Sequence, residues 1–480
     1  MSSRAFPSKE KINTRKHYLK VKNNLPAKNG IIYHRGGITH TRDDTDVELD
    51  FRQESNFSYL SGVEAAGYHI VIVLESDTIY LIRPDTPKAE QLWKGIPEPD
   101  AILMERYNVD HILLDTQLKE FLKHLEPKVI FTLDITSIDY NNYIPNEFEK
   151  RIDREHLKAA IHEARLTKFS WEISLLRYAT HISSHAHINL ISHCGEKYRH
   201  GQEINEAELE ARFRWICGKN GLSRQCYIPI IASGPRAAVL HYTNNDKIIP
   251  NDQHALVLVD AGGEYRCYGS DVTRTFPVST KFSKEAKTIY NIVLKAQNAV
   301  LARLKPGVFW KDMHDLVVRI LCHELVKIGI LIGDEKELIQ LGVYRAFYFH
   351  GKYTNSYLEG SFKLVMGTGH SVGLDCHDVG GKEISILDTT RKGFPLHLLL
   401  KPLDKDMVIT VEPGLYFNDV SIDLWTKNSD YRQYFDVDKI NQYRVIGGVR
   451  IEDTVLITCN GIENFTVVPK EVQDIEALMQ

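Results

Sequence analysis

The sequence predicts two domains, an α/β domain at the N-terminus and a larger C-terminal domain that mixes long helices with strands. A chain of 480 residues is longer than one ordinary hydrophobic core accommodates. Over the first third of the chain, strand-like runs alternate with helical segments, which is typical of α/β architecture. This pattern changes near residue 160, so we place the domains at residues 1–158 and 159–480.

Each predicted element rests on its apolar spacing. The strand-like runs of the first domain are GIIYH, YHIVIVL and TIYLIRP, and its clearest helix is DTQLKEFLKHLE. After the boundary, EARLTKFSWEISLLRYATHISSHAHINLI carries apolar residues at helical spacing over several turns. A further helix is predicted from the N-cap residue Ser283 to the pair Pro306-Gly307, and its apolar stripe belongs to the core.

Composition narrows the function classes. The hydrophobic content of 43% and the charged content of 25% are those of a soluble globular protein. A formal charge of −4 argues against nucleic-acid and anionic-membrane partners, and no apolar run approaches the roughly 18 residues of a membrane span. The N-terminus has no apolar signal region, and seven cysteines without a C-x-x-C pair indicate a reducing compartment. We therefore expect a cytoplasmic protein.

Two aspartates mark the first informative segment, HALVLVDAGGEYRCYGSDVTRTFP. Asp260 ends an apolar run, and Asp271 follows eleven positions later. If a hairpin folds about Tyr265-Arg266, Asp260 and Asp271 face each other directly across the ladder on one face. Opposed carboxylates repel, so a shared proton or a cation must compensate. For either aspartate alone, an exposed turn or a capping role is an equally good interpretation.

Two glutamates occupy similar places further along. MVITVEPGLYF puts Glu412 at the end of another β-branched run. In GGVRIEDTVLIT the alternation directs Arg450 and Glu452 to one side of a strand and the apolar residues to the other. For a single strand this is more often a solvated face, but four such carboxylates in one chain favour a common site.

A glycine-rich run, LVMGTGHSVGLDCHDVGG, lies between these segments and carries His370 and His377. Four carboxylates and one imidazole suit a hard or borderline divalent cation such as Mn²⁺. Four carboxylates exceed what one ion would neutralise, whereas two ions roughly 3.5–4 Å apart with bridging carboxylates would use them all. Such an ion pair activates water and polarises a carbonyl, so the residues point to hydrolysis.

With these motifs the sequence resembles the pita-bread metallopeptidases, in the branch of aminopeptidase P and prolidase, the Xaa-Pro dipeptidase. LVDAGGEYRCYGSDVTRTFP, GTGHSVGLDCHDVGG, ITVEPGLYF and GGVRIED are similar to the four metal-site motifs of that family, in order and with similar spacing. FRQESNFSYLSG is similar to a segment of its N-terminal domain, and ASGPRAAVLHY to the stretch that carries a further active-site histidine. The resemblance implies an aminopeptidase P-like α/β domain followed by an α+β pita-bread catalytic domain of the creatinase/aminopeptidase type.

The resemblance also implies the site and the activity. Two divalent metal ions, which we expect to be Mn²⁺, would bind Asp260, Asp271, His370, Glu412 and Glu452. Asp271 and Glu452 would bridge the ions, His241 and His377 would position substrate and stabilise charge, and Arg450 would orient the site. The substrates would be small proline-containing peptides cut at the Xaa–Pro bond, and the enzyme would be a homodimer.

The chain departs from the family pattern beside the ligand histidine. The family run H-G-x-G-H ends at that histidine, but Met366 occupies its first position here. His350-Gly351 would restore the pattern if residues 352–367 were removed. This segment is therefore either an insertion at the lip of the site or an error in the gene model.

A second departure concerns substrate length. Prolidases carry an arginine for the free carboxylate of a dipeptide, and Leu398 stands at that place, with Lys401 nearby. We therefore expect an Xaa-Pro aminopeptidase that accepts longer peptides. The alternatives are a strict Xaa-Pro dipeptidase and, from another class, a non-catalytic pita-bread scaffold that binds a partner.

Overall fold

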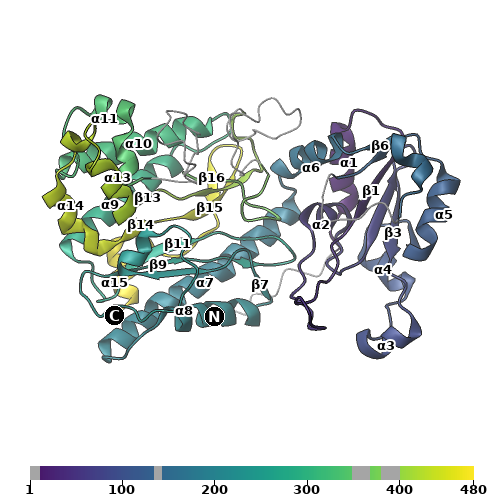
Figure 1. Ribbon diagram of the computed structural model, residues 1–480, viewed down its shortest axis with the longest axis horizontal. Coiled ribbons are helices and arrows are strands. Elements are labelled where there is room, and N and C mark those ends of the chain that lie inside the picture. Colours follow the sequence, from purple (N-terminus) through teal and green to yellow (C-terminus); the bar gives the residue numbers. More distant parts are fainter. Residues whose placement is uncertain (1–10, 134–142, 349–367, 380–400) are drawn as a thin grey trace. The chain divides into compact units, whose positions relative to one another are not determined.

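The computed structural model describes residues 11–133, 143–348, 368–379 and 401–480. Within these residues the chain forms two compact units, and the chain passes from the first to the second between Leu166 and Thr167 (Figure 1). The first unit is an α/β domain and the second combines long helices with several small sheets. The fold class predicted from the sequence is therefore confirmed.

A six-stranded mixed sheet forms the centre of the N-terminal unit, in the order β4-β3-β2-β1-β5-β6. The β1–β2 and β2–β3 pairs are antiparallel, whereas β1–β5, β3–β4 and β5–β6 are parallel. The predicted strand runs match β1, β2 and β3. The bounds of the strands are β1 (Ile31–Arg35), β2 (His69–Val73), β3 (Thr78–Arg83), β4 (His111–Leu114), β5 (Ile130–Phe131) and β6 (Ile152–Asp153).

Helices cover both faces of this sheet, with α1, α2 and α6 on one side and α5 on the other (Figure 1). Leu118 and Leu122 of α5, four residues apart, pack in one core cluster with Ile31 and Val71 of the sheet. The apolar stripe that contains these two leucines is the pattern from which a helix was predicted for DTQLKEFLKHLE. The helix bounds are α1 (Thr14–Asn24), α2 (Ser55–Ser61), α3 (Lys88–Lys94), α4 (Asp100–Arg106), α5 (Asp115–Leu125) and α6 (His156–Leu166).

Among the described residues, four short sheets form the centre of the C-terminal unit. The larger two are three-stranded, in the orders β11-β9-β8 and β12-β15-β16, and the pairs β10–β7 and β13–β14 complete the set. An isolated bridge between Thr273 and Glu452 joins two of these segments. The bounds are β7 (Arg224–Gln225), β8 (Ile230–Ser233), β9 (Leu256–Asp260), β10 (Gly263–Glu264), β11 (Thr273–Pro277), β12 (Val408–Val411), β13 (Gly414–Tyr416), β14 (Gly448–Arg450), β15 (Asp453–Ile457) and β16 (Ile462–Asn464).

Long helices flank these sheets, with α7 and α8 on one side and α9 and α10 on the other (Figure 1). The apolar stripe predicted for the first of them is buried along α7. The main bounds are α7 (Ser170–Arg199), α8 (Glu206–Lys219), α9 (Lys284–Leu301) and α10 (Trp310–Lys327), followed by the shorter α11 (Glu335–Leu341), α13 (Asp419–Thr426), α14 (Val437–Tyr443) and α15 (Val472–Leu478).

The predicted start of α9 is confirmed, because the Ser283 hydroxyl accepts a hydrogen bond from the Ala286 N–H (3.2 Å). The helix ends at Leu301, however, earlier than the predicted stop at Pro306-Gly307. The Arg303 N–H donates to the Val300 carbonyl (2.8 Å), which tightens the last turn and ends the α-helical ladder. None of the helices in the described ranges combines the length and the apolar character that crossing a bilayer requires.

Candidate metal centre

Asp260 is the last residue of β9, and Asp271 precedes β11 by two residues. The prediction that the two aspartates pair directly across the ladder is wrong, because Asp260 pairs with Thr273. The turn lies at Arg266-Cys267, both at positive φ, between the bridged residues Tyr265 and Tyr268. This places the turn one residue later than predicted, and Asp271 therefore lies diagonal to Asp260 on the same face of the ladder.

Tyr227 brings the two aspartates together. Its phenolic oxygen lies 2.5 Å from Asp260 Oδ1 and 2.6 Å from Asp271 Oδ1. A tyrosine hydroxyl has one proton and can donate to only one of these oxygens at a time. The single proton of Tyr227 therefore cannot satisfy both carboxylates, and their close approach indicates a place for a positive charge.

His370 connects these aspartates to Glu412. Its Nε2 lies 3.2 Å from Asp271 Oδ2 and 3.5 Å from Glu412 Oε1, while its Nδ1 lies 3.0 Å from the carbonyl oxygen of Ser371. A backbone carbonyl at Nδ1 favours the tautomer whose Nε2 is available to a metal ion. Burial lowers the pKa of His370, but Asp271 and Glu412 outweigh burial and raise it to about 9.

Glu412 and Glu452 complete the group of carboxylates. Glu412 follows β12, and burial, with a smaller contribution from Asp271, raises its pKa to about 7. Glu452 lies between β14 and β15 and is 1% exposed. Burial, together with the charges of Asp271 and Glu412, raises the pKa of Glu452 well above its usual range. Both glutamates therefore lie where the charge of their ionised forms is not balanced by a nearby positive charge.

Arg450 points into the same space as Glu452, as the strand period predicts. Its guanidinium donates to Thr273 Oγ1 (3.0 Å) and to the Tyr416 hydroxyl (3.0 Å), and it forms an ion pair with Asp260. Thr273 Oγ1 in turn donates to Glu452 Oε2 (2.6 Å). Arg450 is thus fixed by three contacts and neutralises one carboxylate of the group.

The donor set fits divalent cations. Asp271, His370 and Glu452 offer ligand atoms that all lie within 4.8 Å of one another. Burial is the main cause that raises the pKa values of Asp260, Glu412 and Glu452, because the charged form of a buried carboxyl needs a counter-charge. Carboxylate oxygens with one imidazole suit Mn²⁺ and similar ions better than soft ions.

His377 lies beside this group, and its ring centroid is 4.2 Å from that of His370. His377 is exposed, so it can contact a molecule in solution. His241 is also exposed and lies after the 3-10 helix η2 (Gly234–Ala238); within the described ranges no hydrogen bond or ring contact joins it to the other predicted site residues. Leu398 and residues 350–367 lie outside the described residues, and Lys401 is exposed.

The sequence did not indicate Tyr227, Thr273 or Tyr416, although all three touch the site. Thr273 could have been found from the period of two that starts at Asp271. Tyr227 could not, because it contacts residues 33 and 44 positions away and its own segment carries no pattern.

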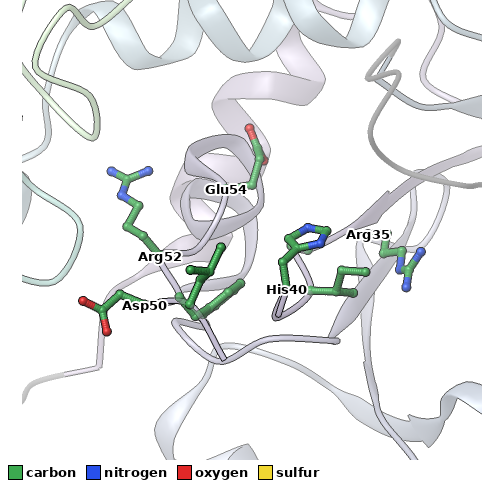
Figure 2. A pocket seen from close by; sticks show the side chains of 10 residues that line it. Arg35, His40, Asp50, Arg52 and Glu54 are labelled. Carbon is green, nitrogen blue, oxygen red and sulfur yellow. The ribbon is translucent and has the colours of Figure 1, made fainter. Parts of the chain in front are cut away.

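A cavity of about 290 Å³ lies in the N-terminal unit. It adjoins the predicted FRQESNFSYLSG segment, in which Glu54 accepts a hydrogen bond from the Phe57 N–H (2.7 Å) and caps α2. Figure 2 shows that Arg35 and Arg52 extend in different directions, with His40 between them. The charged side chains that line this cavity do not converge on one point, in contrast to the carboxylates of the C-terminal unit.

Comparison with protein families gives two matches. Residues 174–459 match the model of metallopeptidase family M24, and residues 12–131 match that of the aminopeptidase P N-terminal domain. The first range contains all the acidic residues of the candidate centre.

Curated relatives and solved structures agree with these matches. The chain is 37% identical over 457 residues to a probable Xaa-Pro aminopeptidase PEPP of Paracoccidioides lutzii, covering 94% of this chain and 92% of the relative. A relative with the same description from Talaromyces marneffei is also 37% identical, with the same coverage. The structure resembles aminopeptidase PepP of Pseudomonas aeruginosa (TM-score 0.78, 29% identity, 98% of each chain) and Escherichia coli aminopeptidase P with the inhibitor Pro-Leu (TM-score 0.77, 28% identity, 98% of this chain and 99% of that chain).

Proposed function

The chain belongs to metallopeptidase family M24, and we propose that it is an Xaa-Pro aminopeptidase, which releases the first residue of peptides that carry proline in second position. The observation that carries this proposal is the convergence of four carboxylates and His370. The chain that holds them matches probable Xaa-Pro aminopeptidases over nearly its whole length.

The metal set belongs to this proposal. Two divalent ions, Mn²⁺ in our assignment, would be held by Asp260, Asp271, His370, Glu412 and Glu452, with Asp271 and Glu452 as the bridging ligands. When bound, such ions lower the pKa of a water molecule and polarise a carbonyl group. The raised pKa values of the carboxyl groups support this assignment, because cations would replace the protons that burial favours.

The protein's own side chains would prepare and complete the site. Arg450 holds Asp260 through an ion pair, and Tyr227 holds the Asp260 and Asp271 carboxylates at one point. His377, exposed beside His370, would donate to the peptide carbonyl and stabilise charge as it develops. His241, which is exposed, would help to position the same peptide.

Other features of the proposal rest on the family alone. We assign residues 1–158 to the aminopeptidase P-like domain and residues 159–480 to the catalytic domain, and we propose a cytoplasmic homodimer. Leu398 at the place of the prolidase arginine favours peptides longer than two residues, since a carboxylate anchor is missing there.

The test compares four peptides with the purified, Mn²⁺-loaded protein: Ala-Pro-Ala, the dipeptide Ala-Pro, Ala-Ala-Ala and N-acetylated Ala-Pro-Ala. We expect release of alanine from Ala-Pro-Ala with the highest kcat/KM, and no cleavage of the last two. A higher kcat/KM for Ala-Pro would establish the dipeptidase alternative, and no cleavage of any peptide would favour a binding scaffold.

A further inference from the structure

A thiol that the proposed chemistry does not use lies among the proposed metal ligands. Cys376 belongs to the loop between His370 and Asp378, and its thiol donates a hydrogen bond to Asp271 Oδ2 (2.9 Å). His370 Nε2 approaches the same carboxylate oxygen at 3.2 Å. A sulfur atom and an imidazole nitrogen therefore lie on either side of one oxygen of the metal centre.

His377 completes a group of three ligands that differs in kind from the carboxylates. His370, Cys376 and His377 each offer a nitrogen or sulfur atom, and these three atoms lie within 4.8 Å of one another. Zinc binds sulfur at about 2.3 Å and nitrogen at about 2.0–2.1 Å, so two ligands of one tetrahedral ion lie roughly 3.3–3.6 Å apart. Small rotations of the three side chains would bring their ligand atoms to these distances.

The donor atoms of this group select a different ion from that of the carboxylates. One thiolate and two imidazoles favour Zn²⁺ and similar ions, whereas carboxylate oxygens suit Mn²⁺. As the sulfur–metal bond forms, the S–H bond breaks and its proton leaves to the solvent. Binding therefore exchanges one proton for one ion, and it needs no oxidant or other reactant.

The group is open to the solvent on one side. His370 is buried, Cys376 is partly exposed and His377 is exposed. Asp271 and Glu452 of the carboxylate centre, by contrast, are 4% and 1% exposed. An ion from solution can therefore reach His377 and Cys376 without any change in the fold.

His370 belongs to both ligand sets. Its Nδ1 lies 3.0 Å from the carbonyl oxygen of Ser371, which leaves Nε2 as the nitrogen for a metal ion. Nε2 carries one lone pair and coordinates one ion at a time. An ion that Cys376 and His377 hold together with His370 therefore deprives the carboxylate centre of its imidazole ligand.

We propose that His370, Cys376 and His377 form an inhibitory site for Zn²⁺, in which Cys376 supplies a thiolate and the ion withdraws His370 from the Mn²⁺ centre. The binding of the ion rests only on the position of the three ligands. Its effect on peptidase activity rests in addition on the proposed function.

The binding test uses Cd²⁺ as a probe, because a bond between cadmium and a thiolate gives a charge-transfer band in the ultraviolet. Metal-free Cys459→Ser protein, which lacks the exposed thiol, should show this band with Cd²⁺, and added Zn²⁺ should remove it. The band should be absent when Cys376→Ser is added, since a serine hydroxyl can still donate to Asp271 but supplies no thiolate. No band in the Cys459→Ser protein, or an equal band in both proteins, would overturn the proposal.

The inhibition test follows cleavage of Ala-Pro-Ala by the Mn²⁺-loaded protein as Zn²⁺ is added. Half inhibition of Cys376→Ser should need at least roughly tenfold more Zn²⁺ than that of the original protein, since even outer-shell partners of a metal ligand contribute about 10–100-fold to affinity. Cys459→Ser, the matched control, should be inhibited like the original protein. Equal sensitivity of Cys376→Ser and the original protein would contradict the inhibitory role. A protein that shows the cadmium band but cleaves no peptide would refute the proposed function and support the metal site.

Discussion

The ammonium nitrogen of Lys168 lies 3.0 Å from Asp378 Oδ2, and each side chain is 1% exposed. Lys168 lies just before α7, and Asp378 follows His377 in the chain. The Asp378 N–H also donates to the carbonyl of Ser371 (2.9 Å), which closes the loop between His370 and Asp378. This buried ion pair therefore fixes the segment that carries both histidines of the proposed site.

The first prediction is that Lys168→Met lowers the midpoint of thermal unfolding markedly. Removing one partner of a buried pair leaves an uncompensated charge and costs about 3–5 kcal/mol. Adding Asp378→Asn should recover part of this loss, because the second change removes that charge. Lys405→Met is the control, since the Lys405–Asp406 pair is exposed and should contribute little. An unchanged midpoint in Lys168→Met would contradict the role of the pair.

The second prediction concerns Thr273, whose hydroxyl accepts from Arg450 Nε (3.0 Å) and donates to Glu452 Oε2 (2.6 Å). Thr273→Val keeps the shape and removes both hydrogen bonds, at a cost of about 1–3 kcal/mol for the groups left unpaired. We expect Mn²⁺ affinity to fall, measured by calorimetry, because Glu452 loses its orientation. Thr273→Ser should retain the affinity, and equal loss in both variants would assign the effect to packing.

The third prediction separates the two neighbouring histidines. His377→Ala should keep its metal content and lose much of kcat, because a group that stabilises charge in the transition state affects turnover more than binding of the ions. His370→Ala should lose metal affinity, since its Nε2 faces Asp271 and Glu412. Elemental analysis beside steady-state kinetics measures both, and the reverse pattern would exchange the two roles.

The fourth prediction concerns pH in the metal-free protein. Its folded state holds Glu412 at a pKa of about 7 against an ordinary 4.5, and His370 at about 9 against 6.5. Between its ordinary pKa and its raised pKa, each group binds more protons in the folded than in the unfolded state. The free energy of unfolding therefore falls as the pH rises from about 4.5 to 7 for Glu412 and from about 6.5 to 9 for His370.

Divalent ions replace these protons, so the stabilisation by Mn²⁺ should be larger at about pH 8.5 than at about pH 6. The measurement is the difference between the thermal midpoints with Mn²⁺ and with a chelator at each pH. A difference that shrinks as pH rises would contradict the assignment of Glu412 and His370 to the metal centre.

Local patterns were enough to indicate the carboxylates and the direction of Arg450. Glu412 follows a β-branched strand, and the period of two that directs Arg450 and Glu452 to one side agrees with their shared partner Thr273. The pairing of Asp260 with Thr273 was not predicted, because the register is set by the turn residues Arg266 and Cys267. Their left-handed backbone conformation leaves no apolar pattern in the sequence.

Long-range partners were beyond the reach of such patterns. Lys168 meets Asp378 across 210 positions, and Cys376 meets Asp271 across 105. Neither contact is encoded in the spacing of its own segment, because helix and strand periods relate only near neighbours in the chain. The fold brings these side chains together, and only the structure identifies them.

The central claim is that one metal centre in the C-terminal unit carries Xaa-Pro peptidase activity. Its most direct test is a titration of chelator-treated protein with Mn²⁺, in which the rate of Ala-Pro-Ala cleavage is followed against the bound metal. We predict no cleavage without metal and a rate that rises to a plateau at about two ions per chain, as expected for a two-metal site. Full activity in protein that elemental analysis finds free of metal would contradict the account.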